Sequence, residues 1–190
     1  MDDLVKAALK KWPNVPACFG WLGLDSRGQW WMRDDRAQRC GAFASGAPGA
    51  KGSHLRHDKL IEFIGRNYER EATGPHAGAW FFQNGPQKVY LELESTPLIM
   101  RVSANNSTAQ VSTHTGQAAQ VQLCLLDEAG RLYLATDLGL GLVHTQDMAQ
   151  AADLIEAGVW EPTEVSSADL PTHYGYVTSP QLTQAMASTD

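Results

Sequence analysis

Cysteine, long apolar runs and, in the second half, cations are scarce in this chain. The cysteines Cys18, Cys40 and Cys124 are an odd number at wide spacing, and no Cys-x-x-Cys pair occurs. This pattern is typical of reduced thiols and predicts a cytoplasmic protein. No apolar run approaches the roughly 20 residues of a membrane helix, and the acidic start of the chain is unlike a signal peptide. We therefore expect no membrane partner.

Cations almost disappear after residue 95. Residues 1–95 carry 13 Lys and Arg against 11 Asp and Glu, whereas residues 96–190 carry 2 against 10. An acidic half of this kind repels nucleic acid, so no nucleic-acid partner is expected, while a basic partner is left open. With 190 residues, 43% of them apolar, the chain can bury a real core as one domain or as two small halves.

Two distant segments of the chain have the same order of features. In each, an apolar run reaches an Asp-x-x-Gly turn, Asp25–Gly28 or Asp127–Gly130, and a second strand-like run and an amphipathic helical segment follow. The order predicts an α+β fold of two similar halves, residues 1–104 and 105–190, packed as one body. Each half should hold a mostly antiparallel sheet with one packed helix. An internal duplication explains the similarity, and two unrelated hairpins with ordinary helices are the alternative.

Hydrophobic periodicity and turn residues predict the positions of individual elements. The Gly-rich stretch 34–53 is expected to be a mobile loop, and a helix should follow it with Ser53 or Asp58 as its N-cap. After residue 160 we expect an irregular tail. The remaining expected elements are a helix at 2–12, a hairpin at 19–24 and 29–33, a hairpin at 80–83 and 88–94, and a helix at 145–157.

Three strings resemble an uncharacterised family of proteobacterial proteins. They are the pattern W-L-x-L-D-x-R-G-x-W from Trp21, F-I-x-R-N-Y from Phe63, and W-F-F-Q-N-G-P-Q-x-V-Y from Trp80. A more distant similarity points to a second bacterial family of unknown function, in which a comparable hairpin, helix and hairpin precede a β-rich second half. The resemblance covers mainly residues 19–102 and implies a fold. It implies no catalytic residue, because neither family has an assigned activity.

Aromatic and basic residues of the first half are the candidate binding groups. The two hairpins contain more aromatic rings than a small sheet must bury. This excess favours an aromatic surface exposed to a ligand or partner. The loop 34–53 is an insertion relative to the second half, and its cations near a helix start are suited to an anion, although a solvated loop is the alternative. The predicted ligand-binding residues are Trp30, Trp31, Arg36, Arg39, Lys51, Arg56, His57 and Trp80.

Motifs for catalysis and cofactors are incomplete. The Gly-rich run 46–53 has its Lys before the last Gly, so it does not match a phosphate-binding loop. His54, His57 and Asp58 lie close together but lack the further ligands of a zinc site. Glu92 and Glu94 share a strand face, where solvated carboxylates are usual. We therefore predict no catalytic residue, no metal site and no cofactor.

These observations favour a cytoplasmic, non-enzymatic module that binds a small ligand or a protein, with a regulatory role left open. The alternative is a small hydrolase or transferase that acts on an anionic substrate through His57, Asp58, Arg36 and Lys51. A homodimer formed through an exposed strand edge is a third hypothesis. The sequence does not identify the ligand.

Overall fold

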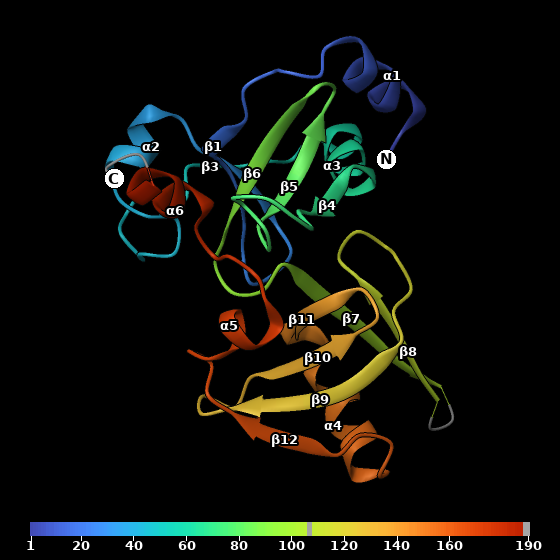
Figure 1. Ribbon diagram of the computed structural model, residues 1–190. Coiled ribbons are helices and arrows are strands. Elements are labelled where there is room, and N and C mark those ends of the chain that lie inside the picture. The colour runs from blue at the N-terminus through green and yellow to red at the C-terminus, as the bar shows by residue number, and fades with distance from the viewer. Residues whose placement is uncertain (106–107, 188–190) are drawn as a thin grey trace. The chain divides into compact units, whose positions relative to one another are not determined.

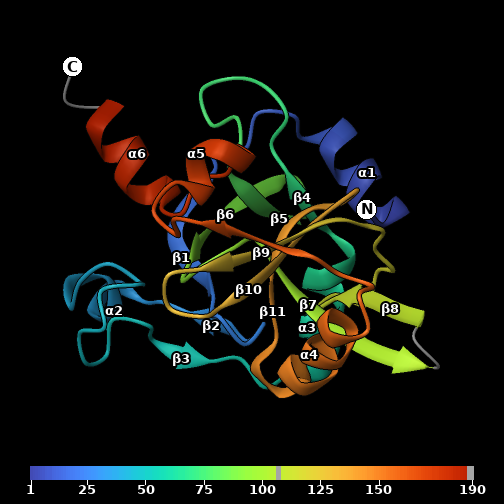
Figure 2. The same cartoon turned by 90° about the horizontal axis from the view of Figure 1, so that it is seen from below.

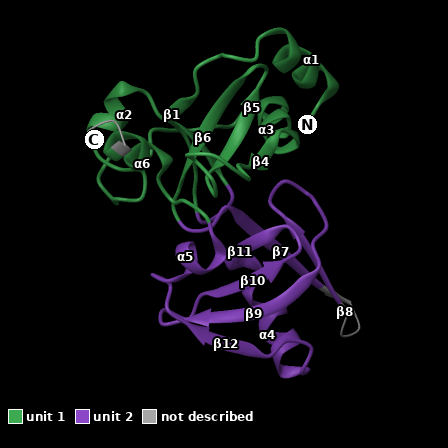
Figure 3. Ribbon diagram, viewed as in Figure 1, with its two compact units in different colours: residues 1–25, 29–94, 176–190 green, residues 26–28, 95–175 purple. Residues whose placement is uncertain are grey.

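The computed structural model describes residues 1–105 and 108–187, which form two compact units (Figure 1). Unit 1 comprises residues 1–25, 29–94 and 176–190, and unit 2 comprises residues 26–28 and 95–175 (Figure 3). The unit boundary thus falls ten residues before the predicted position at 104, ahead of a strand rather than after it. The end of the chain returns to unit 1.

Unit 1 is built on sheet A, whose six strands have the order β3-β2-β1-β6-β5-β4. All neighbouring pairs are antiparallel except β1 and β6. The strands are β1 (Cys18–Leu24), β2 (Trp30–Met32), β3 (Ser53–His54), β4 (Tyr68–Arg70), β5 (Trp80–Asn84) and β6 (Gln87–Leu93). The helices are α1 (Asp3–Lys11), α2 (Asp35–Arg39), α3 (Asp58–Arg66) and α6 (Pro180–Ala187).

Helices lie on both faces of sheet A. On one face, the Phe63 ring of α3 meets the Phe82 ring of β5 edge-on, with 5.5 Å between centroids. On the other face, Glu92 of β6 accepts hydrogen bonds from Ser179 Oγ at 2.5 Å and from the Gln181 N–H at 3.0 Å, which fixes the start of α6. A buried carboxylate therefore anchors the C-terminal helix.

Unit 2 is built on sheet B, whose six strands have the order β12-β9-β10-β11-β7-β8. Two neighbouring pairs, β11 with β7 and β12 with β9, are parallel, and the other three are antiparallel. The strands are β7 (Leu98–Asn105), β8 (Thr108–Thr113), β9 (Val121–Asp127), β10 (Leu132–Thr136), β11 (Gly139–Val143) and β12 (Pro162–Val165). The helices are the 3-10 turn η1 (Thr145–Asp147), α4 (Met148–Glu156) and α5 (Leu170–Tyr174). Figure 2 shows α4 beside β7.

The two units share a four-stranded arrangement. The order β3-β2-β1-β6 in sheet A matches β11-β10-β9-β12 in sheet B, with the same parallel and antiparallel pairings. A helix follows the equivalent third strand in both, α3 after β3 and α4 after β11. Gly28 and Gly130 close the equivalent hairpin turns with the same φ of 75°, a backbone conformation that glycine adopts without strain. The predicted α+β fold of two similar halves is confirmed.

Several local predictions are wrong. The stretch 34–53 contains α2 and the buried residues Phe43 and Ala50, because the chain folds back over sheet A instead of remaining a solvated loop. The N-cap of α3 is His57, not Ser53 or Asp58. Beyond residue 160 lie β12, α5 and α6, where an irregular tail was expected. None of the helices in residues 1–105 and 108–187 has the length and apolar character to span a bilayer.

Candidate functional site

A largely apolar groove of about 450 Å³ lies in unit 1, on the face of sheet A that α3 covers. Side chains from β1, β2, β5, β6 and α3 form its walls. We call it the Trp21 groove. It is lined by Trp21, Leu22, Met32, Arg33, Asp34, Ser53, Leu55, Leu60, Ile64, Phe82, Asn84 and Val89.

Helix α3 forms one wall of the groove because its apolar residues recur at helical spacing. Leu60 and Ile64 are four residues apart and therefore lie on one face of the helix, toward Phe82 and Val89 of the sheet. The helix begins where His57 Nδ1 accepts the backbone N–H of Leu60 at 3.3 Å. This cap satisfies one of the free N–H groups at the helix start and fixes where the wall begins.

A β-bulge directs Trp21 into the groove. Side chains alternate along a regular strand, so Trp21 and Leu22 should point to opposite faces of sheet A. The pairing of β1 with β6 shifts register between Cys18 and Leu22, and Gly20 has a φ of 78°. A bulge of this kind re-aims a side chain, which accounts for the presence of both Trp21 and Leu22 in the lining.

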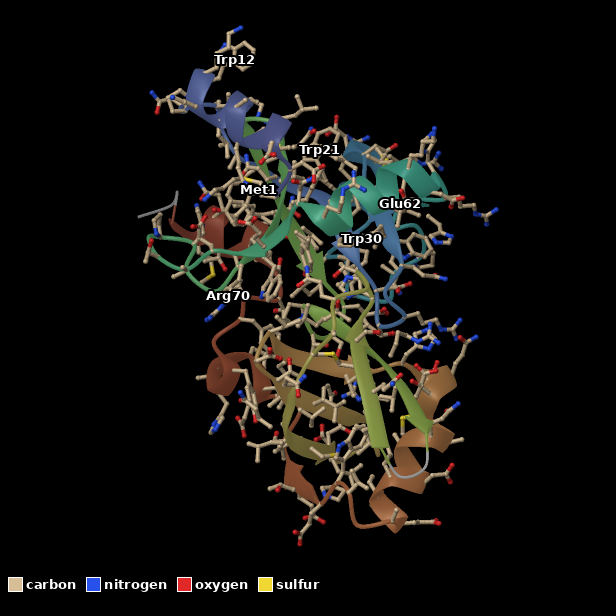
Figure 4. All side chains as sticks on the ribbon, turned by 90° about the vertical axis from the view of Figure 1, so that its right-hand side faces the viewer. Met1, Trp12, Trp21, Trp30, Glu62 and Arg70 are labelled. Carbon is tan, nitrogen blue, oxygen red and sulfur yellow. The ribbon has the colours of Figure 1, made fainter. Side chains whose placement is uncertain are left out.

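Two large apolar side chains of the groove are exposed to solvent. Trp21 has a relative exposure of 47% and Met32, on the adjacent strand β2, of 52%. Figure 4 shows the Trp21 side chain close to α3. Exposed tryptophan and methionine beside a hollow offer a flat ring and an adaptable thioether to a ligand.

The polar part of the groove is small and carries no available cation. Arg33 lines it, but its guanidinium is 1% exposed and donates to the carbonyls of Ala50 at 2.8 Å, Gly41 at 2.6 Å and Gly20 at 3.3 Å. Burial lowers the pKa of the Arg33 guanidinium from its ordinary value, and the nearby Glu92 carboxylate opposes that shift.

The other polar lining residues are Asp34, Ser53 and Asn84. One Asp34 oxygen accepts the Ala37 N–H at 2.8 Å and so caps α2. A carboxylate, a hydroxyl and an amide thus form a neutral-to-acidic rim beside the apolar surface.

The aromatic residues predicted from sequence occupy two other places in unit 1. Trp30 and Trp80 are buried and pack on Tyr68, with ring centroids 5.3 and 4.8 Å from it. Trp31 is half-buried and donates its Nε1–H to Asp25 at 2.9 Å. Trp30 and Trp80 are therefore used in the core, whereas Trp31 is half-buried and Trp21 is exposed.

The predicted basic residues lie in three segments of unit 1: α2, the turn before β3, and the start of α3. Lys51 Nζ lies 5.8 Å from the Trp31 ring centroid and forms an ion pair with Glu94 at 2.6 Å, so the structure brings this lysine and this tryptophan together. Arg36 and Arg39 are exposed on α2, and Arg56 and His57 are exposed at the start of α3. Among the described residues that line the groove, none of the eight predicted binding residues occurs.

Two of the groups considered for catalysis, Glu92 and His57, make structural hydrogen bonds in unit 1. Glu92, predicted to be solvated, is 2% exposed and holds α6, because its strand is covered on both faces. His57 caps α3 and is exposed. In residues 1–105 and 108–187, no group of three or more His, Cys, Asp and Glu side chains could hold a metal ion.

Sequence reasoning missed Trp21 and Met32 as surface groups. The available signal was Phe19-Gly20-Trp21-Leu22, where a glycine precedes two apolar residues in a strand. A glycine inside a strand often marks a bulge, and a bulge breaks the alternation from which we assigned faces.

Comparison with known proteins gives a family without an assigned function. The model of a family described as "Protein of unknown function (DUF2946)" matches residues 1–181. No curated protein matches the chain. A solved structure of a DUF1285 family protein from Silicibacter pomeroyi DSS-3 is 14% identical, with a TM-score of 0.47 over 81% of this chain and 85% of that one. The family match confirms the expected resemblance to an uncharacterised family.

Proposed function

The chain belongs to this family of proteins of unknown function, and we propose that it is a non-enzymatic module that binds a small apolar ligand in the Trp21 groove. The observation that carries the proposal is the exposure of Trp21 and Met32, 47% and 52%, beside a hollow of about 450 Å³. Leaving such surface in water costs about 25 cal/mol per Å², a cost that a bound apolar molecule removes.

The size and rim of the groove favour a particular class of ligand. Small-molecule sites enclose about 300–1,000 Å³ and combine apolar walls with a few polar groups. The Arg33 donors are committed to backbone carbonyls, and Asp34 adds a negative charge to the rim. The ligand is therefore a neutral or cationic molecule with an apolar body and one polar end. An anionic substrate, as the enzymatic alternative requires, finds no free cation among the described lining residues.

Two further features complete the proposal. The three cysteines Cys18, Cys40 and Cys124 are free thiols, and the Cys40 thiol is exposed, which supports a reducing, cytoplasmic location. The shared four-strand order of the two sheets supports an origin by internal duplication. In this view unit 1 acquired the groove after the duplication. The groove lining includes residues of the inserted stretch 34–53 and of strand β5. Neither of these segments belongs to the four-stranded arrangement that the two units share.

A fluorescence titration with Nile red, a neutral apolar dye, tests the proposal. The variant Trp21→Ala removes the exposed ring, and the matched control Trp12→Ala removes another exposed tryptophan, 51% accessible, that is not part of the groove lining. We expect Trp21→Ala to weaken Nile red binding by about tenfold, the loss of about 1.4 kcal/mol, and Trp12→Ala to leave it unchanged.

Met32→Ser provides a second test from the neighbouring strand. Met32 is exposed, so this change should leave thermal stability within about 0.5 kcal/mol while reducing dye affinity. Equal Nile red affinity in the wild-type protein, Trp21→Ala and Met32→Ser would reject the groove as the binding site.

A further inference from the structure

The turn between β5 and β6 is a two-residue loop in unit 1 (Figure 1). Asn84 pairs with Gln87 as the last pair of the ladder, and Gly85 and Pro86 form the loop between them. Gly85 has a φ of 57°, a backbone conformation that tight hairpin loops require and that glycine adopts without strain. The turn therefore holds an asparagine directly before a glycine at the end of a hairpin.

An asparagine followed by glycine can react with its own backbone. The glycine nitrogen attacks the asparagine Cγ and forms a C–N bond that closes a five-membered succinimide ring, and the side-chain nitrogen leaves with the displaced proton as ammonia. Water then opens the ring at either carbonyl and leaves aspartate or isoaspartate. In sum, an amide and water give a carboxylic acid and ammonia. Because both reacting groups belong to neighbouring residues, the first step is intramolecular, and its rate depends on access and geometry.

Both reacting groups of this turn are accessible. The Asn84 side chain is exposed, and its amide makes no hydrogen bond to the residues that the structure describes. The Gly85 N–H likewise donates to no described residue. A Cβ atom added at Gly85 would have Cβ of Ala8, 4.0 Å away, as its nearest neighbour, so the space around the attacking nitrogen is open.

Two other asparagines of unit 1 show what protects such a side chain. Asn67 is completely buried, its Nδ2 donates to a backbone carbonyl at 2.9 Å, and its Oδ1 accepts a backbone N–H at 2.8 Å. Asn14 is exposed, but the β-branched residue Val15 follows it and crowds the nitrogen that would attack. Of these three asparagines, Asn84 is the one that combines exposure with a following glycine.

The reaction would change the Trp21 groove, because Asn84 lines it. Among the residues that line the groove, Asp34 carries the one carboxylate, and the Arg33 guanidinium is bound to backbone carbonyls. A carboxylate at position 84 would add a second negative charge to this rim. Such a charge acts on a ligand as in any other charge-changing modification, and it favours a cationic ligand over a neutral one.

We propose that Asn84 is a site of spontaneous deamidation in the folded protein and that the product shifts the Trp21 groove toward cationic ligands. The first part depends on the hairpin turn alone, and the second part rests on the proposed function of the groove. Newly made protein carries an amide at this position and older protein carries a carboxylate. The ligand preference of the groove therefore changes with the age of the molecule.

Peptide mass spectrometry of the full chain, incubated near neutral pH at physiological temperature, tests the first part. Each deamidation adds about 1 Da to the peptide that contains the asparagine. We expect this mass gain at Asn84 to be at least about tenfold faster than at Asn14, and we expect none at Asn67. Asn84→Gln lengthens the side chain by one methylene and disfavours the five-membered ring, so the gain at position 84 should disappear. Asn14→Gln is the matched control and should leave it unchanged.

Nile blue, a cationic relative of Nile red, tests the second part. Asn84→Asp reproduces the charge of the product at an exposed position. We expect the incubated wild-type protein and Asn84→Asp to bind Nile blue about threefold more tightly than fresh wild-type protein, with a difference that shrinks as salt is raised. Nile red is neutral, so its affinity should be the same in all three. Asn84→Gln should show no change in Nile blue affinity after incubation.

Several results would overturn the proposal. A mass gain at Asn84 that is no faster than at Asn14, or one that occurs in urea but not in the folded protein, would reject the deamidation site. A mass gain in the folded protein without a change in Nile blue affinity would reject the effect on the groove. If neither dye binds fresh protein, the proposed function of the groove fails, and the mass measurement still decides whether Asn84 is modified. The two proposals therefore fail separately.

Discussion

Asp25 and Asp127 make the same two hydrogen bonds in the turns of the β1–β2 and β9–β10 hairpins. Each carboxylate accepts the backbone N–H of the residue four positions later at 2.8 Å and a ring donor six positions later at 2.9 Å. The ring donor is Nε1 of Trp31 in unit 1 and the hydroxyl of Tyr133 in unit 2. Two chemically different side chains thus hold the two equivalent turns. The two hairpins share the position of the hydrogen-bond donor but not the type of residue that provides it.

The first prediction concerns these ring donors. Tyr133→Phe removes only the hydroxyl, and it leaves a buried Asp127 oxygen with one partner fewer, so we expect a loss of about 1–2 kcal/mol in the free energy of unfolding. Trp31→Phe should have a similar effect through Asp25. Urea denaturation followed by circular dichroism measures both. Trp12→Phe, at an exposed position, serves as the control and should change stability by less than about 0.5 kcal/mol.

A second prediction concerns pH and the ion pair of unit 2. Hydrogen bonds from Arg101 to Asp147, at 2.6 and 3.1 Å, lower the pKa of this carboxyl below its ordinary value of 3.8, and burial only partly opposes the shift. A group with a lowered pKa in the folded state adds stability above its unfolded pKa and loses that contribution as pH falls through the folded pKa. Asp147 therefore stabilises unit 2 at neutral pH and not in strong acid.

Asp147→Asn tests this sign. At pH 7 we expect it to lower the free energy of unfolding by about 1–3 kcal/mol, because a charged hydrogen-bond partner of Arg101 is lost. As the pH is lowered from 5 to below 3.8, the difference between the wild-type protein and the variant should shrink. Urea titrations at several pH values measure it. A difference that grows toward acid would contradict the assignment.

The third prediction concerns the inserted stretch of unit 1. The Arg33 guanidinium donates to the carbonyls of Gly41 at 2.6 Å and Ala50 at 2.8 Å, so one buried cation fixes both ends of this turn region. Lysine keeps the charge but has a single nitrogen and cannot reach both acceptors. We expect Arg33→Lys to cost about 3 kcal/mol and to speed hydrogen exchange over residues 41–50. Arg39→Lys, at an exposed site of α2, should change neither.

Short-range signals in the sequence were sufficient to predict the hairpins. The turn glycines Gly28, Gly85 and Gly130 all have positive φ, so each Asp-x-x-Gly or Asn-Gly pattern corresponded to a real turn. The existence of helix α3 followed from its apolar spacing, although its N-cap is His57 and not the predicted Ser53 or Asp58. These elements depend on residues close together in the chain, which is why sequence patterns contain them.

Features that depend on distant residues were not predictable in the same way. An irregular tail was expected after residue 160, whereas Pro180 begins α6, a helix whose start is held by Glu92 from far earlier in the chain. The interior position of Glu92 and the inserted stretch over sheet A likewise result from tertiary packing. The Trp21 groove was missed because the bulge at Gly20 depends on how β1 pairs with β6, and no single-strand pattern reports that pairing.

The last prediction concerns the contact between β1 and the inserted stretch. A Cβ atom added at Gly23 would lie 2.5 Å from the ring of Phe43, a buried residue, so the stretch can lie against β1 only because this position has no side chain. We expect Gly23→Ala to cost about 1–3 kcal/mol through overpacking. Phe43→Leu alone should cost less than about 1.5 kcal/mol, since it largely keeps apolar volume at the site.

The double variant with Gly23→Ala and Phe43→Leu distinguishes a clash with the Phe43 ring from a direct destabilisation of strand β1 by the substitution at Gly23. If the methyl group added at Gly23 clashes with the Phe43 ring, a leucine at position 43 leaves room for that methyl group. The loss of unfolding free energy in the double variant should then be smaller than the sum of the two single losses by about 0.5 kcal/mol or more. Urea unfolding of all four proteins gives this coupling energy. Additive losses would mean that Gly23 is needed for the strand itself and that the close approach of Phe43 does not determine the residue at this position.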